Sequence, residues 1–285
     1  MYRKCTRVLS SALLALTGWL QAEALAQSVL EAERLLTLTT GNLPLVLVAP
    51  HGGREAIPGI GIRQGNGVPQ FKTGRDHNTA ELAEAIALKL GQMSGAKPFL
   101  VIARFHRKYI DANRPSIEAY EALEAQPYYG AFHSAVDEAC KQIRQVWGRG
   151  LLLDIHGQAA EANVIFRGTM HGKSVTDLVQ RFGRQAMTGR HSILGQLALS
   201  GYKILPEPSV NDRESRYSGG HTVQTYGSHR ATRIDAIQLE FGTRLRARGN
   251  VDQTAVDVAA AIRVFAKEYL PIKLEGMEPS IVTQP

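Results

Sequence analysis

Residues 43–53 read LPLVLVAPHGG, and this stretch decides how the chain is organised. Its first seven residues are all apolar or Pro, and they precede Pro50-His51 and two glycines. A short apolar run bounded by Pro and Gly is typical of a strand that is buried on both faces. Because ligands in open α/β sheets bind beyond the carboxyl ends of the strands, His51 is a candidate functional residue.

Similar runs recur along the chain and alternate with amphipathic segments. This alternation predicts an α/β protein with three layers, α/β/α, in which a mostly parallel mixed sheet has helices on both faces. The expected strands are 46–49, 99–103, 151–155, 163–166, 203–205 and 236–241.

Helical periodicity is clearest in residues 79–90, TAELAEAIALKL, where Leu82, Ile86 and Leu90 share one stripe. Residues 132–146 and 251–270 are predicted helices for the same reason. The segments rich in Gly and Pro, 50–75 and 206–232, are predicted loops, and loops of this length in a compact domain are usually functional or disordered.

The N-terminus has the three parts of a secretory signal peptide. A basic start is followed by an apolar stretch at 8–20, which is shorter than the roughly 20 residues of a spanning helix. Ala24 and Ala26 then have the spacing of a signal-peptidase site. We therefore predict a signal peptide at 1–26 and a single α/β hydrolase domain at 27–285. The mature protein is expected in the periplasm or secreted, with no transmembrane anchor after cleavage.

Removing the signal peptide lowers the formal net charge from +7 to +5 and leaves Cys140 as the sole cysteine. An internal disulfide is then impossible, so a hydrophobic core must hold the domain. The mild positive charge is spread along the sequence, which suits an acidic substrate and argues against nucleic-acid binding. The sequence does not indicate an oligomeric state.

Two histidines and two carboxylates are expected at the same edge of the sheet. His51, His156 and Glu240 each end a predicted strand, and Asp76 stands just before the helix at 79–90, close to a candidate N-cap at Asn78. Imidazoles plus a carboxylate are the ligands of a catalytic zinc site that keeps one position open for water. Zinc activates water for amide hydrolysis near neutral pH, and Glu240 is placed to move the proton.

Each of these residues also has a structural interpretation. Asp76 could be a charge stabilised by the helix dipole, in which case Glu55 or His77 would be the third zinc ligand. Glu240 could form an ion pair with a nearby arginine. Asp154, inside a predicted strand, is expected to orient a ligand rather than to bind the metal itself.

The segment ARFHRKYIDANRPS, residues 103–116, is the candidate substrate anchor. Arg104 and Arg114 could each grip a substrate carboxylate with two parallel hydrogen bonds, and Asn113 could donate another. Asp111 could orient Arg114 or form a structural ion pair with one of the arginines.

These residues resemble the N-formylglutamate amidohydrolase family of zinc hydrolases, which have a phosphorylase/hydrolase-like α/β/α fold. Besides Asp76, the matching pieces are VAPHGG at 48–53, IDANR at 110–114, LLLDIHG at 151–157, YSGGHTVQTYG at 217–227 and IQLEFGTRLR at 237–246. The resemblance implies an amidohydrolase in which His51, Asp76 and His156 hold zinc, Glu240 lies near the reactive water, and Asn113 and Arg114 bind a substrate carboxylate. Further candidates are Arg104, Gly219 and Gly220 for substrate binding, and Asp154 and Asp111 as orienting residues. The expected substrate is a small acidic N-acyl amino acid or peptide.

Two other functions remain open. The order of the metal-site residues is also similar to that of zinc N-acetylmuramoyl-L-alanine amidases, so an amidase or carboxypeptidase acting on peptidoglycan is the alternative enzyme. The second alternative is a non-enzymatic envelope module that binds an acidic ligand in the same crevice.

Overall fold

The computed structural model describes residues 27–28, 30–208, 213–231 and 233–272. The predicted signal peptide at 1–26 lies outside the described residues. Among the residues described, no helix has both the length and the apolar character needed to cross a membrane.

The described part of the chain forms one seven-stranded mixed sheet in the order β1-β3-β2-β4-β7-β5-β6. The central strands β3, β2, β4 and β7 run parallel, whereas β1 is antiparallel to β3, and β5 is antiparallel to β7. The strand bounds are β1 Leu36–Thr39, β2 Leu45–Ala49, β3 Phe99–Ala103, β4 Leu151–Gly157, β5 Val164–Gly168, β6 Lys203–Leu205 and β7 Asp235–Phe241.

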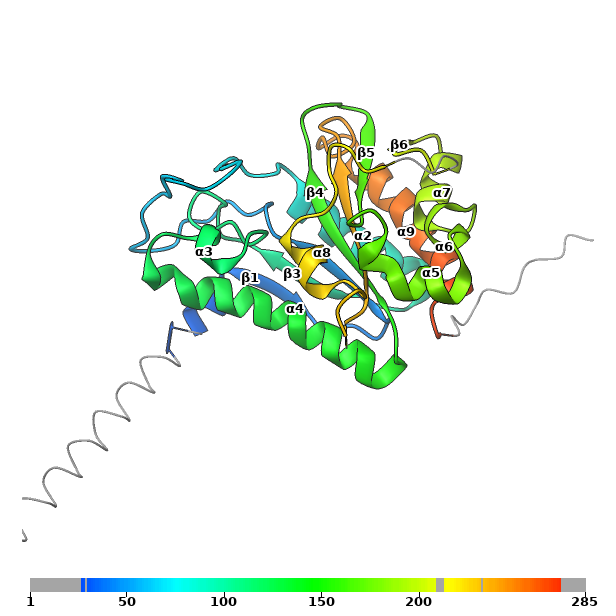
Figure 1. Cartoon of the computed structure of the whole chain (residues 1–285), viewed down its shortest axis with the longest axis horizontal. Helices are drawn as coiled ribbons and strands as arrows, with labels where there is room; N and C mark the ends of the chain where they lie inside the picture. The colour runs from blue at the N-terminus through cyan, green and yellow to red at the C-terminus, as the bar shows by residue number, and fades with distance from the viewer. Residues whose placement is uncertain (1–26, 29, 209–212, 232, 273–285) are drawn as a thin grey trace, which may run out of the picture.

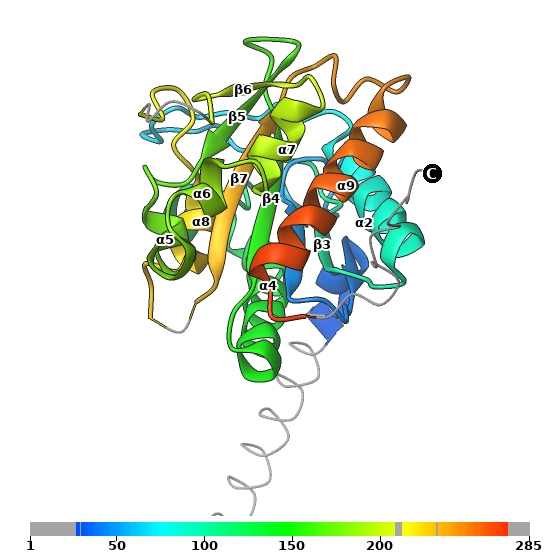
Figure 2. The same cartoon turned by 90° about the vertical axis from the view of Figure 1, so that its right-hand side faces the viewer.

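Helices cover both faces of the sheet, which confirms the predicted three-layer α/β/α fold. Helix α4 lies along one face (Figure 1), and α2 and α9 lie side by side on the other (Figure 2). The helix bounds are α2 Thr79–Ser94, α3 Ser116–Ala119, η1 Leu123–Ala125, α4 Gln126–Trp147, η2 Lys173–Val175, α5 Thr176–Phe182, α6 Gln185–Thr188, α7 Ile193–Leu199, α8 His221–Tyr226 and α9 Val251–Tyr269.

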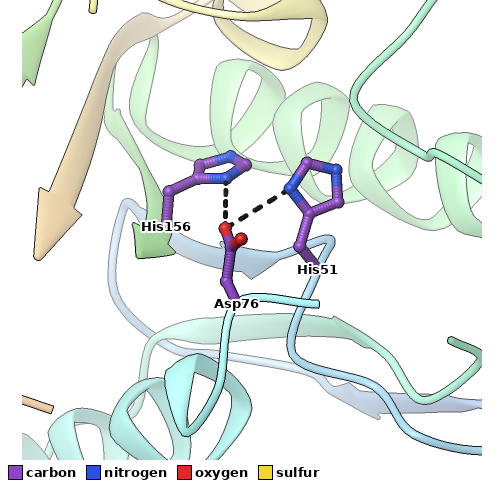
Figure 3. Close-up of side chains that lie close together, drawn as sticks. All are labelled: His51, Asp76 and His156. Carbon is purple, nitrogen blue, oxygen red and sulfur yellow. Dashed lines mark hydrogen bonds and ion pairs between the residues drawn. The ribbon is translucent and has the colours of Figure 1, made fainter. Parts of the chain in front are cut away.

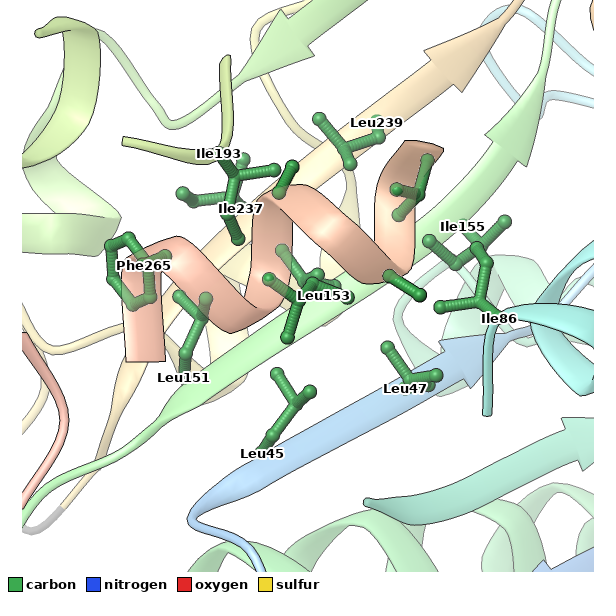
Figure 4. Packing of buried hydrophobic residues seen from close by; sticks show 14 of the residues in the cluster. Leu45, Leu47, Ile86, Leu151, Leu153, Ile155, Ile193, Ile237, Leu239 and Phe265 are labelled. Atoms are coloured by element: carbon green, nitrogen blue, oxygen red, sulfur yellow. The ribbon is translucent and has the colours of Figure 1, made fainter. Parts of the chain in front are cut away.

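Each central strand divides its side chains between two cores. On β4, Leu151, Leu153 and Ile155 pack against α2 and α9 (Figure 4), whereas Leu152 points to the α4 side. Because side chains alternate along a strand, Asp154 and His156 must also point to the α4 side. The same alternation on β7 sends Ile237, Leu239 and Phe241 to the first core and Gln238 and Glu240 to the other face.

Three details differ from the sequence-based predictions. Strand β1 was not predicted, because it is a short edge strand with three partly or fully exposed residues. The predicted loop at 206–232 contains α8. Asn78 occupies the N-cap position of α2 in a left-handed conformation, but its side chain makes no capping bond and donates to the carbonyl of Arg246 at 2.8 Å.

Gly52 and Gly53 are required by close packing. A Cβ on Gly52 would lie 2.4 Å from the backbone nitrogen of Ala80, and one on Gly53 would lie 2.3 Å from the carbonyl oxygen of Phe105. The loop that carries His51 therefore passes directly over the start of α2, and only glycine permits this approach.

Asp235, the first residue of β7, is expected to make stability depend on pH. Burial raises the pKa of Asp235 from 3.8 to about 6. The hydrogen bonds that Asp235 accepts from Ser228 and Leu178 lower this pKa, but burial outweighs them. The folded protein therefore holds this proton more tightly than the unfolded chain does. The contribution of Asp235 to the free energy of unfolding is greatest below pH 3.8 and is lost as the pH rises through 6.

The Asp235→Asn variant does not titrate at this position. Relative to the wild type it should gain stability between pH 4 and pH 7, by up to about 3 kcal/mol for a shift of roughly two pH units. Urea unfolding at several pH values measures this difference. A difference between the two proteins that is the same at every pH would contradict the assignment.

Candidate metal site and the cavity around it

Three segments that are distant in sequence meet at the carboxyl edge of the sheet. His51 follows β2, His156 is on β4, and Asp76 lies just before α2. Asp76 is held in place through its backbone, because its N–H donates to the carbonyl of His51 at 2.9 Å. The N–H of Gly157 also donates to Asp76 Oδ2 at 3.1 Å.

The side chains of these three residues converge on a single point (Figure 3). Asp76 Oδ2 lies 3.4 Å from His51 Nδ1 and 3.2 Å from His156 Nδ1. One donor atom from each residue lies within 4.8 Å of the other two, and the three residues are 2%, 9% and 2% exposed in chain order. Glu55 and His77, the alternative third ligands, are exposed and outside this group.

The far nitrogen of each imidazole faces a carboxylate. His51 Nε2 lies 2.6 Å from Asp111 Oδ1, and His156 Nε2 lies 3.0 Å from Asp154 Oδ2. Histidines that bind a metal through one nitrogen commonly donate from the other to a carboxylate, which fixes the tautomer and the ring orientation. Asp111 therefore occupies the position of an orienting residue. Asp154 lies within ion-pair distance of His156, but neither of its oxygens forms a hydrogen bond within the described residues.

These residues fit a divalent metal ion. His51 Nδ1 is buried and has no hydrogen-bond partner among the described residues, because its 3.4 Å contact with Asp76 Oδ2 is poorly aligned for a hydrogen bond. Burial raises the pKa of Asp76, but its close contacts with the two histidines and their charges outweigh it and hold that pKa well below its usual range. A buried anionic carboxylate beside two ring nitrogens is a donor set that zinc accepts.

Glu240 lies next to this group on the neighbouring strand. It is paired in register with His156, and it is 7% exposed. Burial raises the pKa of Glu240. The charges of His156 and His51 lower this pKa and those of Asp76 and Asp154 raise it, so that the net shift is upward. Gln238 Nε2 donates to Glu240 Oε1 at 2.8 Å and so fixes the carboxylate. A buried carboxylate with a raised pKa is the kind of group that general acid–base catalysis uses.

Arg107 is a site residue that the sequence interpretation missed. Its Nε and Nη2 lie 2.8 and 2.7 Å from Asp111 Oδ2, and its Nη1 lies 3.9 Å from Asp76 Oδ1. Burial raises the pKa of Asp111, but the charges of His51 and Arg107 outweigh it and lower that pKa. No local pattern marked Arg107, because residues 104–115 form no helix and a spacing of four residues brings side chains together only on a helix.

The predicted substrate anchor is only partly at the site. Arg114 lines the cavity and pairs with Glu118 at 3.4 Å, so the expectation that Asp111 orients Arg114 is wrong. Arg104 does not line the cavity, because its guanidinium pairs with Glu84 and with Thr37 Oγ1 on β1.

Asn113 is buried between His156 and α8. Its Oδ1 accepts from the N–H and the hydroxyl of Thr222 at 2.8 and 3.1 Å, and its Nδ2 lies 3.1 Å from His156 Nε2. The amide is therefore used to hold His156 and the first turn of α8 together. This position differs from the predicted role of Asn113 as a free donor to substrate.

Gly219 and Gly220 lie on the wall of the cavity, as a substrate-binding role requires. Gly219 has φ +107°, and a Cβ on Gly220 would lie 2.2 Å from Asn113 Nδ2. The Gly220 N–H is already taken by Gln238 Oε1 at 2.6 Å. Gly220 thus lets the backbone approach Asn113 closely, and Gly219 adopts a backbone conformation that residues with a side chain rarely take.

The site opens into a cavity of about 960 Å³. Its floor is formed by the metal-site residues and Glu240, and its walls come from residues 70–76 and 216–221. One wall is anchored by Glu214, a buried carboxylate that accepts hydrogen bonds from Arg167, Thr169 and the backbone of His171.

Asp111 is expected to tune metal affinity through His51. Asp111→Asn keeps the side-chain size but removes the anionic acceptor for His51 Nε2, so zinc affinity should fall by about 10–100-fold. Competition with a chromogenic chelator measures the change. Asp137→Asn, on α4 and paired with Arg233 away from the cavity, is the matched control. Equal affinities of the two variants would show that Asp111 does not support the metal ligand.

The protein is similar to solved structures, but no family model and no curated protein matches it by sequence. N-formylglutamate amidohydrolase from Ralstonia eutropha JMP134 superposes with a TM-score of 0.55 at 19% identity, over 81% of this chain and 97% of that one. A gene product of Agrobacterium tumefaciens superposes with a TM-score of 0.52 at 14% identity, over 82% and 95%. The chain therefore shares the fold of N-formylglutamate amidohydrolase, as the order of its sequence motifs predicted.

Proposed function

We propose that this protein is a zinc-dependent amidohydrolase that cleaves an amide bond next to a carboxylate, in an N-acyl amino acid or a peptide. The observation that carries the proposal is the convergence of His51 Nδ1, Asp76 Oδ2 and His156 Nδ1 beside the buried Glu240. The solved structure of an N-formylglutamate amidohydrolase with this fold supports a hydrolase, although one fold can host several activities.

Each residue of the site has a separate role in the proposed reaction. His51, Asp76 and His156 would hold zinc, which when bound polarises an amide carbonyl and lowers the pKa of water. Glu240 accepts a proton from water at its carboxylate and returns it to the leaving nitrogen. Gln238 keeps that carboxylate oriented through its bond to Oε1. Arg107 and Asp111 hold His51 in place.

The charge of the cavity favours an acidic substrate. Arg114 lines the wall, and among the described residues its guanidinium makes only long contacts, 3.4 Å to Glu118 and 3.3 Å to the carbonyl of Gln70. A substrate carboxylate can compete with such contacts, because an arginine–carboxylate pair with two parallel hydrogen bonds is shorter and stronger.

We also propose that the protein works outside the cytoplasm, in the periplasm or as a secreted enzyme. The support is the basic, apolar and Ala-x-Ala pattern of residues 1–26. Protein recovered from the periplasm or the medium should begin at Gln27, as N-terminal sequencing would detect.

A side-by-side assay tests the proposed function. Purified mature protein should contain about one zinc per chain and should hydrolyse N-acyl amino acids with a carboxylate, and a chelator should abolish this activity. Hydrolysis of peptidoglycan fragments alone would favour the amidase or carboxypeptidase alternative. Metal-free protein with full activity would contradict the proposal, and zinc-loaded protein that binds acidic ligands without turnover would favour the binding module.

A further inference from the structure

The cavity contains more positive charge than the proposed reaction needs. Of the described residues that line it, two are carboxylates, Asp76 and Glu240, and both are buried at the metal site. Six are cations: Lys72, Arg75, Arg107, Arg114, Arg216 and Arg246.

Four of the six cations have partners within the chain, and the contacts of Arg114 with Glu118 and Gln70 are the long ones described above. Arg107 is bound to Asp111, and Arg75 donates to the carbonyl of Gly52 at 3.2 Å. Arg246 is 6% exposed and uses its guanidinium on backbone carbonyls of three segments. These side chains stabilise the loops of the site, so their guanidinium groups already bind groups of the protein itself.

Lys72 and Arg216 differ from the others, because both are exposed and neither forms an ion pair within the described part of the chain. They come from opposite segments of the cavity wall, and each segment is held by a buried charge. Arg63 donates to the carbonyl of Lys72 at 2.9 Å, and Glu214 anchors the segment that carries Arg216. The two exposed cations therefore lie on segments of the cavity wall whose backbone is held in place by hydrogen bonds to buried side chains.

The size of the cavity also exceeds what a single N-acyl amino acid requires. Cavities of about 300–1,000 Å³ accommodate drug-sized ligands, and the volume of about 960 Å³ lies at the upper end of that range. A wide cleft in which one sign of charge predominates raises the local concentration of oppositely charged ligands.

We propose that the substrate is an acidic oligopeptide with several carboxylates, and that Lys72 and Arg216 select it by binding carboxylates beyond the one next to the scissile amide. This inference rests on the proposed function, since it names the substrate class of the same site. Arg114 binds the carboxylate close to the reacting bond, and the two cations at the mouth bind the rest of the chain.

Binding of two matched peptides tests the proposal. N-formyl-Glu-Glu-Glu and N-formyl-Glu-Gln-Gln have the same length and differ only in two carboxylates. Calorimetric titration into zinc-loaded Glu240→Gln protein keeps the peptides intact during the measurement. We expect the more acidic peptide to bind on the order of tenfold more tightly, since exposed ion pairs each contribute modestly, and we expect added salt to reduce the difference.

Adding Lys72→Gln and Arg216→Gln to the same protein should remove most of this preference. The control is Lys97→Gln, an exposed lysine before β3 that does not line the cavity, and this change should leave the preference intact. Equal binding of the two peptides, or a preference that survives the double substitution, would overturn the proposal. Wild-type protein that shows charge-dependent binding but cleaves none of the peptides would instead contradict the proposed hydrolase function.

Discussion

Replacing Asp76 by alanine is expected to strip the protein of zinc while leaving it folded. Asp76 Oδ2 is the donor that faces both ring nitrogens, at 3.4 and 3.2 Å from His51 and His156. Zinc sites with four protein ligands bind with about 10–16 kcal/mol, so losing one ligand should cost about 3 kcal/mol or more, roughly two orders of magnitude in affinity. Zinc content after dialysis against a weak chelator, together with a thermal melt, measures both effects.

Two neighbouring substitutions serve as controls. Glu55→Ala and His77→Ala remove the alternative ligands that the sequence leaves open, and both side chains are exposed away from the three converging donors. Each variant should keep its zinc. Full zinc occupancy in Asp76→Ala, or loss of zinc in either control, would move the ligand role to another residue.

Glu240→Gln is expected to abolish turnover while zinc is retained. Glutamine has nearly the same size and keeps an oxygen for the hydrogen bond from Gln238, so the fold of the site should persist. It cannot accept the proton from water, and loss of a general acid–base group typically lowers kcat by about 10²–10⁴-fold. Steady-state kinetics and zinc analysis on the same sample separate chemistry from metal binding.

Glu161→Gln is the matched control for Glu240→Gln. Glu161 follows β4 and forms an ion pair with Lys203, but it does not line the cavity. This variant should keep the wild-type kcat. A Glu240→Gln variant with nearly unchanged kcat would show that another group moves the proton.

The sequence predicted the layers and the position of the site because both follow from short-range patterns. Buried parallel strands are continuous apolar runs, and their carboxyl ends meet at one edge, so His51, His156 and Glu240 could be brought together without a structure. Edge strand β1 was missed because a partly exposed four-residue strand has no such signal.

The partners of long polar side chains were not predictable in the same way. Arg104 and Arg107 are three residues apart, yet one pairs with Glu84 on α2 and the other with Asp111 at the metal site. Which way each points depends on the path of the loop after β3, and that path depends on tertiary contacts such as the bridge between Glu55 and Phe105. Asn113 was assigned to substrate for the same reason, since Thr222 is 109 residues away.

Anomalous diffraction at the zinc edge from crystals of zinc-loaded protein would show directly whether His51, Asp76 and His156 bind the same ion. We expect one strong peak per chain at about 2.0–2.2 Å from His51 Nδ1, Asp76 Oδ2 and His156 Nδ1, the usual zinc–ligand distances. A peak bound by other residues, or no peak between the two imidazoles, would contradict this expectation.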